Sequence, residues 1–191
     1  MALQVYADIL KINPNDFNTF NNIGIIFELI GDNNKAIEAY KQAVRINPNH
    51  AKSINNIGVV LYKQKKYKES AQIFEIALQV DENYFEVYSN KGAAYNKAKE
   101  YDKAIESLEM AILKMPNHGG AYTNLGNVYN KLHDYEKASK LHEKSIELEP
   151  NGSNAYSNLG TSYKYLGLSN KAISSYKKAI ELDPNFVNAH F

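Results

Sequence analysis

Five asparagines that recur at a spacing of 34 residues form the pattern in this sequence that most strongly suggests chemistry. They are Asn22, Asn56, Asn90, Asn124 and Asn158. A primary amide offers N–H donors and an acceptor oxygen together, so it complements a peptide group. Helix propensity does not explain the recurrence, because asparagine is a mediocre helix former. We therefore expect this asparagine ladder to hold the backbone of a bound chain.

The remaining polar residues give no support for catalytic or metal-binding chemistry. The five histidines are His50, His118, His133, His142 and His190. None belongs to an HExxH motif or a paired-histidine spacing, and the sequence has no glycine-rich phosphate loop. It also has no cysteine, which excludes disulfide scaffolds and thiolate sites. We expect no catalytic residue, no metal site and no cofactor, so the chain by itself is predicted not to be an enzyme.

The charge and hydropathy of the chain exclude several classes of partner. Its 191 residues include 22 Lys and Arg against 21 Asp and Glu, which leaves a formal net charge of +1. This balance is not expected of a non-specific nucleic-acid binder or of a basic membrane-surface protein. No apolar run approaches the roughly 20 residues that a membrane helix needs. We expect a globular cytoplasmic protein, with the nucleus also open, that binds neither nucleic acid nor membrane.

Prolines and glycines recur with the same period as the asparagines. The prolines are Pro14, Pro48, Pro116, Pro150 and Pro184, with Glu82 at the one missing place. The second series consists of Gly24, Gly58, Gly92, Gly126 and Gly160. Residue types that share one period over the whole chain indicate an array of structural repeats.

The period divides the chain into five complete repeats. Counting Phe17 as position 1, they span residues 17–50, 51–84, 85–118, 119–152 and 153–186. Residues 1–16 match the second half of a repeat, and residues 187–191 open a further one. We therefore treat 1–191 as a single domain and expect a piece of a longer array. The alternative is a complete small protein with poor end caps, because terminal repeats normally carry polar outer faces.

Each repeat is predicted to form two helices. In the fourth repeat an apolar stripe with helical spacing consists of Tyr122, Leu125, Gly126 and Tyr129. A second helix is expected from about Tyr135 to Leu148, and Pro150 then prevents its continuation. The asparagine after each proline is expected to cap the following helix. No segment is predicted to be a strand, so the expected fold class is all-α.

The asparagine ladder occupies position 6 of the repeat, away from the apolar stripe of its helix. At about 100° per residue, position 6 lies roughly 150° from the middle of the stripe formed by positions 4, 7, 8 and 11. Packing within the helix pair therefore does not explain an asparagine at this position. Two interpretations stay open: the amides bind a ligand, or they bridge adjacent repeats or face water.

The repeat resembles the tetratricopeptide repeat. That signature combines a large residue, Leu-Gly, aromatic residues, small residues and a proline at fixed offsets. In the fourth repeat it comprises Tyr122, Leu125, Gly126, Tyr129, Ala138, Ser145 and Pro150. The resemblance extends over essentially the entire chain. It implies an α-solenoid of stacked helix-turn-helix repeats, wound as a right-handed superhelix.

The resemblance also implies a function. In tetratricopeptide arrays the first helices line a concave groove. The asparagine ladder resembles that of the O-linked N-acetylglucosamine transferase superhelix, where such asparagines hold extended peptide segments. This implies a non-catalytic scaffold for a protein or peptide in extended conformation. The alternatives are the substrate-recruiting arm of such a glycosyltransferase, whose catalytic domain is absent from this chain, and a structural module that self-associates through exposed array ends.

Other positions of the first helices are expected to set the preference for a ligand. Stacked helices lie about 10 Å apart and a strand advances about 3.3 Å per residue, so the ladder meets a bound chain about every third residue. Position 13 carries three lysines, which are Lys63, Lys97 and Lys131. We expect them to favour acidic segments, with ordinary solvated lysines as the alternative. Position 5 has no lysine, so a carboxylate clamp is not expected.

Overall fold

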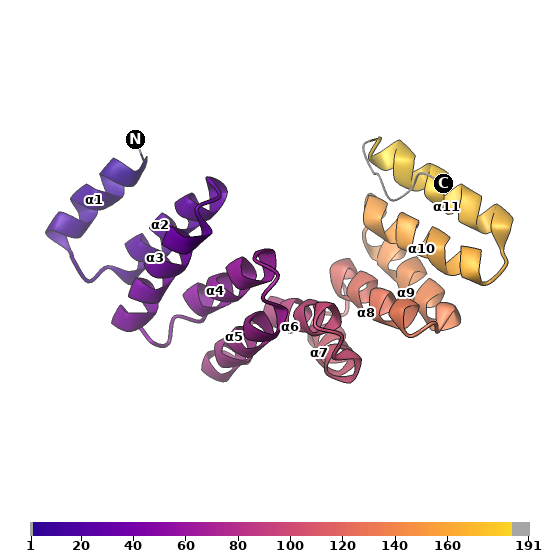
Figure 1. Cartoon of the computed structure of the whole chain (residues 1–191), viewed down its shortest axis with the longest axis horizontal. Coiled ribbons are helices and arrows are strands. Elements are labelled where there is room, and N and C mark those ends of the chain that lie inside the picture. Colours follow the sequence, from indigo (N-terminus) through magenta and orange to yellow (C-terminus); the bar gives the residue numbers. More distant parts are fainter. Residues whose placement is uncertain (1, 185–191) are drawn as a thin grey trace. The chain divides into compact units, whose positions relative to one another are not determined.

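The computed structural model describes residues 2–184, and these form eleven helices and no strand (Figure 1). The expected start of a further repeat at 187–191, with His190, lies outside the described residues. The helices are α1 (Ala2–Ile12), α2 (Phe17–Leu29), α3 (Asn33–Ile46), α4 (Ala51–Lys63), α5 (Tyr67–Val80), α6 (Glu86–Lys97), α7 (Tyr101–Lys114), α8 (Gly119–Lys131), α9 (Tyr135–Leu148), α10 (Ser153–Tyr165) and α11 (Ser169–Leu182). None of the helices between residues 2 and 184 is long and apolar enough to cross a membrane.

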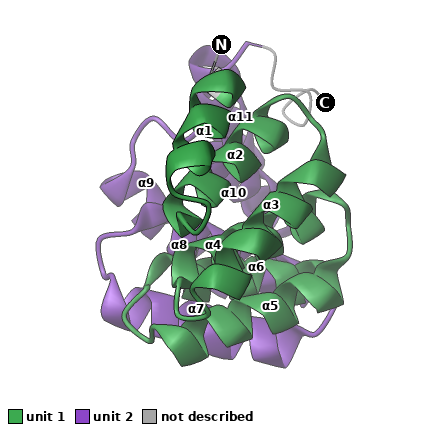
Figure 2. Ribbon diagram, turned by 90° about the vertical axis from the view of Figure 1, so that its left-hand side faces the viewer, with its two compact units in different colours: residues 1–98 green, residues 99–191 purple. Residues whose placement is uncertain are grey.

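The chain divides into two compact units, residues 1–98 and residues 99–191 (Figure 2). Within unit 1, α2 packs on α3, α3 on α4, α4 on α5 and α5 on α6. Within unit 2, the same succession runs from α7 to α11. The first helices of the five repeats are α2, α4, α6, α8 and α10. This stacking of consecutive helices confirms the all-α class and the solenoid arrangement, and α9 has the bounds predicted for it.

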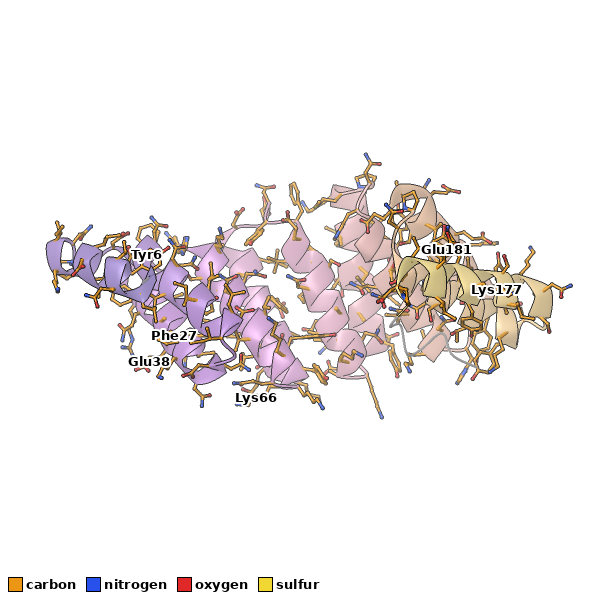
Figure 3. All side chains as sticks on the ribbon, turned by 90° about the horizontal axis from the view of Figure 1, so that it is seen from above. Tyr6, Phe27, Glu38, Lys66, Lys177 and Glu181 are labelled. Atoms are coloured by element: carbon orange, nitrogen blue, oxygen red, sulfur yellow. The ribbon has the colours of Figure 1, made fainter. Side chains whose placement is uncertain are left out.

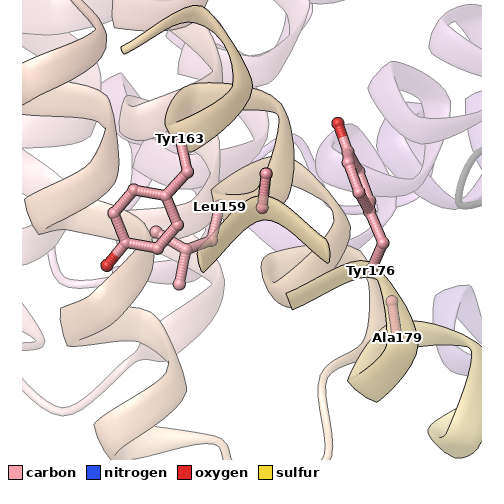
Figure 4. Close-up of a cluster of buried hydrophobic side chains, with 5 residues drawn as sticks. Leu159, Tyr163, Tyr176 and Ala179 are labelled. Atoms are coloured by element: carbon pink, nitrogen blue, oxygen red, sulfur yellow. The ribbon is translucent and has the colours of Figure 1, made fainter. Parts of the chain in front are cut away.

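The helices of one repeat come close together because a glycine at position 8 faces a large residue at position 24. A Cβ atom added to Gly58 would lie 2.6 Å from the ring of Phe74, and one added to Gly24 would lie 2.4 Å from the ring of Tyr40. Both rings are almost completely buried. Only a residue without a side chain permits this approach. In the fifth repeat the corresponding ring is Tyr176, which is buried in one cluster with Leu159, Tyr163 and Ala179 (Figure 4).

The predicted capping by the asparagine after each proline is wrong. Helix α4 begins at Ala51 with His50 as its N-cap, so Asn49 lies outside the helix. The backbone N–H of Asn49 instead donates to Asn47 Oδ1 at 3.1 Å, across the proline. Asparagine and aspartate side chains bond readily to the backbone two residues further on. The residue before the proline therefore closes the turn, and the residue after it supplies the donor.

The turn between the two helices of each repeat depends on one residue with positive φ. At position 15 these residues are Gly31, Lys65, Lys99, His133 and Gly167, with φ between 62° and 81°. A left-handed residue commonly ends a helix and satisfies its last carbonyl groups. The first helix thus stops at the same place in every repeat, which gives positions 5, 6 and 13 equivalent places on successive first helices.

Candidate functional site

All five asparagines of the ladder lie on first helices and are half-buried. Asn22, Asn56 and Asn90 belong to unit 1, on α2, α4 and α6. Asn124 and Asn158 belong to unit 2, on α8 and α10. None of them lies in the core, so each retains contact with solvent.

In unit 1 the ladder asparagines also connect neighbouring repeats. Asn56 Nδ2 donates to Asn21 Oδ1 at 3.1 Å, and Asn90 Nδ2 donates to Asn55 Oδ1 at 3.2 Å. Position 6 of one repeat is thus bound to position 5 of the preceding repeat. A primary amide has two N–H groups and two acceptor lone pairs, so each of these bonds uses only part of its capacity. The side chain of Asn22 makes no hydrogen bond with another described residue.

The sequence analysis missed the residues at position 5 as part of this site. Asn21 and Asn55 are buried, with 3% and 7% of their surface exposed. Asn21 Oδ1 also accepts a hydrogen bond from Ser53 Oγ at 3.0 Å, and Asn55 Nδ2 donates to Asn56 Oδ1 at 3.4 Å. The signal was present in the sequence, because position 5 is small and polar in all five repeats.

The three lysines at position 13 are exposed but differ in their surroundings. Lys63 forms an ion pair with Glu28, with Nζ and Oε1 2.6 Å apart. Glu28 also accepts a hydrogen bond from the Tyr40 hydroxyl at 2.9 Å, and burial together with this carboxylate raises the pKa of Tyr40. Lys97 and Lys131 make no ion pair with any described residue. The charge of Lys63 is therefore compensated, whereas that of Lys97 and Lys131 is not.

A hollow of about 270 Å³ on unit 1 brings two of the predicted site residues together. Asn56 and Lys63 line it beside the Glu28 carboxylate. Ile25, Leu29 and Tyr40 add apolar surface. Leu29 is 81% exposed although it is a large apolar residue. This combination of an apolar wall with an amide and an ion pair suits an amphipathic side chain.

On the first helices of unit 2 several polar side chains are hydrogen-bonded within the unit. Asn130 Nδ2 lies 3.2 Å from Nε2 of the fully buried His142, and Asn130 Oδ1 accepts from Ser162 Oγ at 2.9 Å. Thr161 Oγ1 is 3.1 Å from the Tyr176 hydroxyl. The Asn158 side chain makes no hydrogen bond with another described residue.

The described histidines have structural contacts. His142 is completely buried at the position where the second repeat has Phe74, and burial lowers its pKa to about 4. His50 Nδ1 lies 2.7 Å from Ser53 Oγ, and burial followed by the charge of Lys52 lowers its pKa. Among residues 2–184 no three His, Asp or Glu side chains come together in a way that could hold a metal ion.

Family models recognise most of the chain. Models described as tetratricopeptide repeat match residues 51–84, 83–151 and 118–185, and one described as TPR repeat matches residues 29–65. The chain belongs to the tetratricopeptide repeat family. No curated protein matches this tetratricopeptide array.

Solved structures of other tetratricopeptide proteins have the same fold. A crystal structure of MamA is 27% identical, with a TM-score of 0.73, and the match covers 88% of this chain and 92% of that chain. PilW, described as a type IV pilus biogenesis factor, is 22% identical with a TM-score of 0.85, over 96% of this chain and 86% of that chain. YrrB is 21% identical with a TM-score of 0.71, over 96% and 95% of the two chains.

Proposed function

We propose that this tetratricopeptide array is a non-catalytic protein-interaction scaffold that binds an extended peptide along its first helices through the asparagine ladder. The observation that carries the proposal is a half-buried primary amide at the same position of all five first helices. A buried and fully bonded amide would have no capacity for a ligand. These amides keep contact with solvent, and the bonds that Asn56 and Asn90 make to the preceding repeat leave donors for a peptide carbonyl.

The bonds between positions 6 and 5 support recognition as well as stability. They hold the side chains of Asn56 and Asn90 in one orientation before a ligand arrives. A side chain that is already ordered loses less conformational entropy on binding. The bridging interpretation and the ligand interpretation therefore describe two uses of the same side chain.

The solved structures support the general part of this proposal. The structure of YrrB is described as that of a tetratricopeptide protein with an unusual peptide-binding site. At 21% identity the likeness is one of fold, so the proposed binding residues rest on the contacts of this chain alone. The further resemblance to the repeat array of O-linked N-acetylglucosamine transferases stays a prediction, as does self-association through the array ends.

Removing three amides of the ladder should weaken peptide binding at least tenfold. The variant N22A/N56A/N90A deletes three contacts, and a net hydrogen bond contributes about 0.5–1.5 kcal/mol. A peptide selected from a random display library against the wild-type array supplies the ligand, and isothermal titration calorimetry measures its Kd. The matched control is N15A/N49A/N83A, which removes three exposed asparagines outside the first helices. Equal affinity of the two variants would contradict the ladder as a binding site.

Removing the position-13 lysines should reduce the salt dependence of binding. Lys97 and Lys131 make no ion pair with a described residue, whereas Lys63 is paired with Glu28. For an acidic peptide we expect K97A/K131A to flatten the plot of log Kd against log salt concentration, and K63A to change it little, because screening acts on uncompensated charges. The measurement is a salt titration between 50 and about 500 mM. An unchanged slope in K97A/K131A would show that these lysines are only solvated surface.

A further inference from the structure

In the third and fifth repeats the aromatic residue at position 11 fills a groove beside the second helix of the preceding repeat. In the third repeat the Tyr95 hydroxyl donates to Glu75 Oε2 at 3.4 Å, on the second helix of the preceding repeat. In the fifth repeat Tyr163 donates to Glu143 in the same way. Both glutamates occupy position 25. The ring closes the groove, and the carboxylate accepts from its hydroxyl.

A lysine at position 19 covers the same ring from outside. Lys35 Nζ lies 5.5 Å from the centre of the Phe27 ring. Lys137 Nζ lies 4.9 Å from that of Tyr129. Lys171 Nζ lies 5.3 Å from the centre of the Tyr163 ring. Cations at these distances from a ring face are attracted by its quadrupole. In the fifth repeat positions 11, 19 and 25 thus act together on one ring, whereas the third repeat shows the contact with the carboxylate and the fourth repeat the contact with the lysine.

The second repeat has lost all three members of this arrangement. Position 11 is Leu61 instead of an aromatic residue, and position 19 is Glu69 instead of lysine. The facing residue at position 25 of the first repeat is Lys41 instead of glutamate. At this place unit 1 has an open groove of about 500 Å³, and all three residues line it. The volume is in the range of about 300–1,000 Å³ that ligand pockets have.

The groove has an apolar floor and a polar rim. Its floor consists of Ile57 and Leu61, which belong to a core cluster of unit 1, and of Ile37 and Ile73, which pack against that cluster. Its rim carries the amides of Asn34, Gln64 and Gln72 together with Lys41, Lys66 and Glu69. Lys66 lies on the surface of unit 1 (Figure 3). Neither Lys41 nor Lys66 makes an ion pair with a described residue, so the rim has a net positive charge.

We propose that this groove binds a tyrosine side chain of a partner protein, in a segment where the tyrosine is flanked by acidic residues. The other repeats indicate the chemistry, since a tyrosine of the chain itself fills the equivalent groove beside Glu75 and Glu143. An aliphatic floor accepts the ring, and the rim amides and Glu69 offer acceptors for its hydroxyl. Lys41 stands at the position of Glu75 and Glu143, and both unpaired lysines attract the carboxylates of the residues that flank the tyrosine. This site lies between the second helices α3 and α5, with Ile57 and Leu61 of α4 in its floor, and it includes no asparagine of the ladder.

The test uses isoleucine methyl NMR on the whole chain. The probe is the acetylated, amidated pentapeptide Glu-Asp-Tyr-Asp-Glu, and two further peptides replace its tyrosine by alanine or its four acids by lysine. We expect the first peptide to shift the methyl signals of Ile37, Ile57 and Ile73. The methyl signals of Ile146 and Ile180 in unit 2 should not shift. The other two peptides should bind at least fivefold more weakly. Equal binding of the three peptides, or shifts confined to other isoleucines, would overturn the proposal.

A variant whose own tyrosine side chain fills the groove provides the decisive test. The double substitution L61Y/K41E recreates the pair seen in Tyr95 and Glu75, so the chain should stay folded while its groove closes. Binding of the acidic tyrosine peptide should fall at least tenfold, with the circular dichroism spectrum unchanged. K41E alone leaves the groove open and reverses one charge, and it should reduce the preference for acidic over basic flanks at least threefold. Undiminished binding by the filled variant would refute the site even if the ladder variants behave as proposed.

Discussion

Replacing His142 by phenylalanine is expected to stabilise the protein, and to do so most strongly at acidic pH. His142 is completely buried at the position where Phe74 lies in the second repeat. Its Nε2 is 3.2 Å from Asn130 Nδ2, and its buried Nδ1 has no hydrogen-bond partner among the described residues. An unsatisfied buried polar atom costs about 1–3 kcal/mol. Phenylalanine removes this atom, and Gly126 leaves room for a ring as Gly58 does for Phe74.

The pH dependence follows from the lowered pKa of His142. Burial lowers this pKa from 6.5 to about 4, so between these pH values His142 is protonated in the unfolded chain but neutral in the folded protein. Stability is therefore undiminished above pH 6.5 and is lost as the pH falls towards 4. A shift of this size corresponds to about 3 kcal/mol of unfolding free energy at pH 4. H142F lacks the titrating group, so its advantage over the wild type should grow by that amount between pH 7.5 and pH 4.

Urea denaturation at a series of pH values measures this difference. The reciprocal variant F74H places a histidine against Gly58 and should acquire a pH dependence of the same sign. Parallel curves of unfolding free energy against pH for H142F and the wild type would show that His142 does not carry the effect.

The sequence predicted the helices well because the repeat constrains them five times. Proline, glycine and the apolar stripe recur at fixed positions, so the sequence alone predicts the bounds of α9. The location of the asparagine ladder on first helices followed from the same register. The caps were predicted wrongly, because α4 begins only at Ala51 with His50 as its N-cap, and Asn49 is bonded within the turn to Asn47 instead of capping the helix.

Contacts between repeats could not be predicted from the period. Asn56 and Asn21 are 35 residues apart, and so are Lys63 and Glu28. Whether such side chains meet depends on rotamers and on the crossing of two helices, neither of which a spacing determines. The open groove beside Leu61 could not be predicted from the sequence either. The replacement of an aromatic residue could be read from the sequence, but its coincidence with Lys41 and Glu69 became meaningful only when the three lined one groove.

Asn21→Ala is expected to destabilise the protein by about 2 kcal/mol, whereas the neighbouring Asn22→Ala should cost less than about 0.5 kcal/mol. Asn21 is 3% exposed and accepts hydrogen bonds from Ser53 Oγ and Asn56 Nδ2. Its removal leaves one buried hydroxyl and one half-buried amide without this acceptor. Asn22 is half-buried, and its side chain makes no hydrogen bond with another described residue. Urea denaturation at neutral pH measures both differences.

A double-mutant cycle with N56A shows whether the bond between repeats accounts for the loss. If Asn56 is held by Asn21, the two substitutions should be non-additive by at least about 0.5 kcal/mol, because the second removes a partner already lost. If the losses of unfolding free energy in N21A and N56A add up to the loss in the double variant within error, the bridging bond is contradicted. Peptide affinity then separates the two uses of the amides. N22A should weaken binding without lowering stability, whereas N21A should lower stability and also weaken binding, since Asn56 loses the contact that orients it.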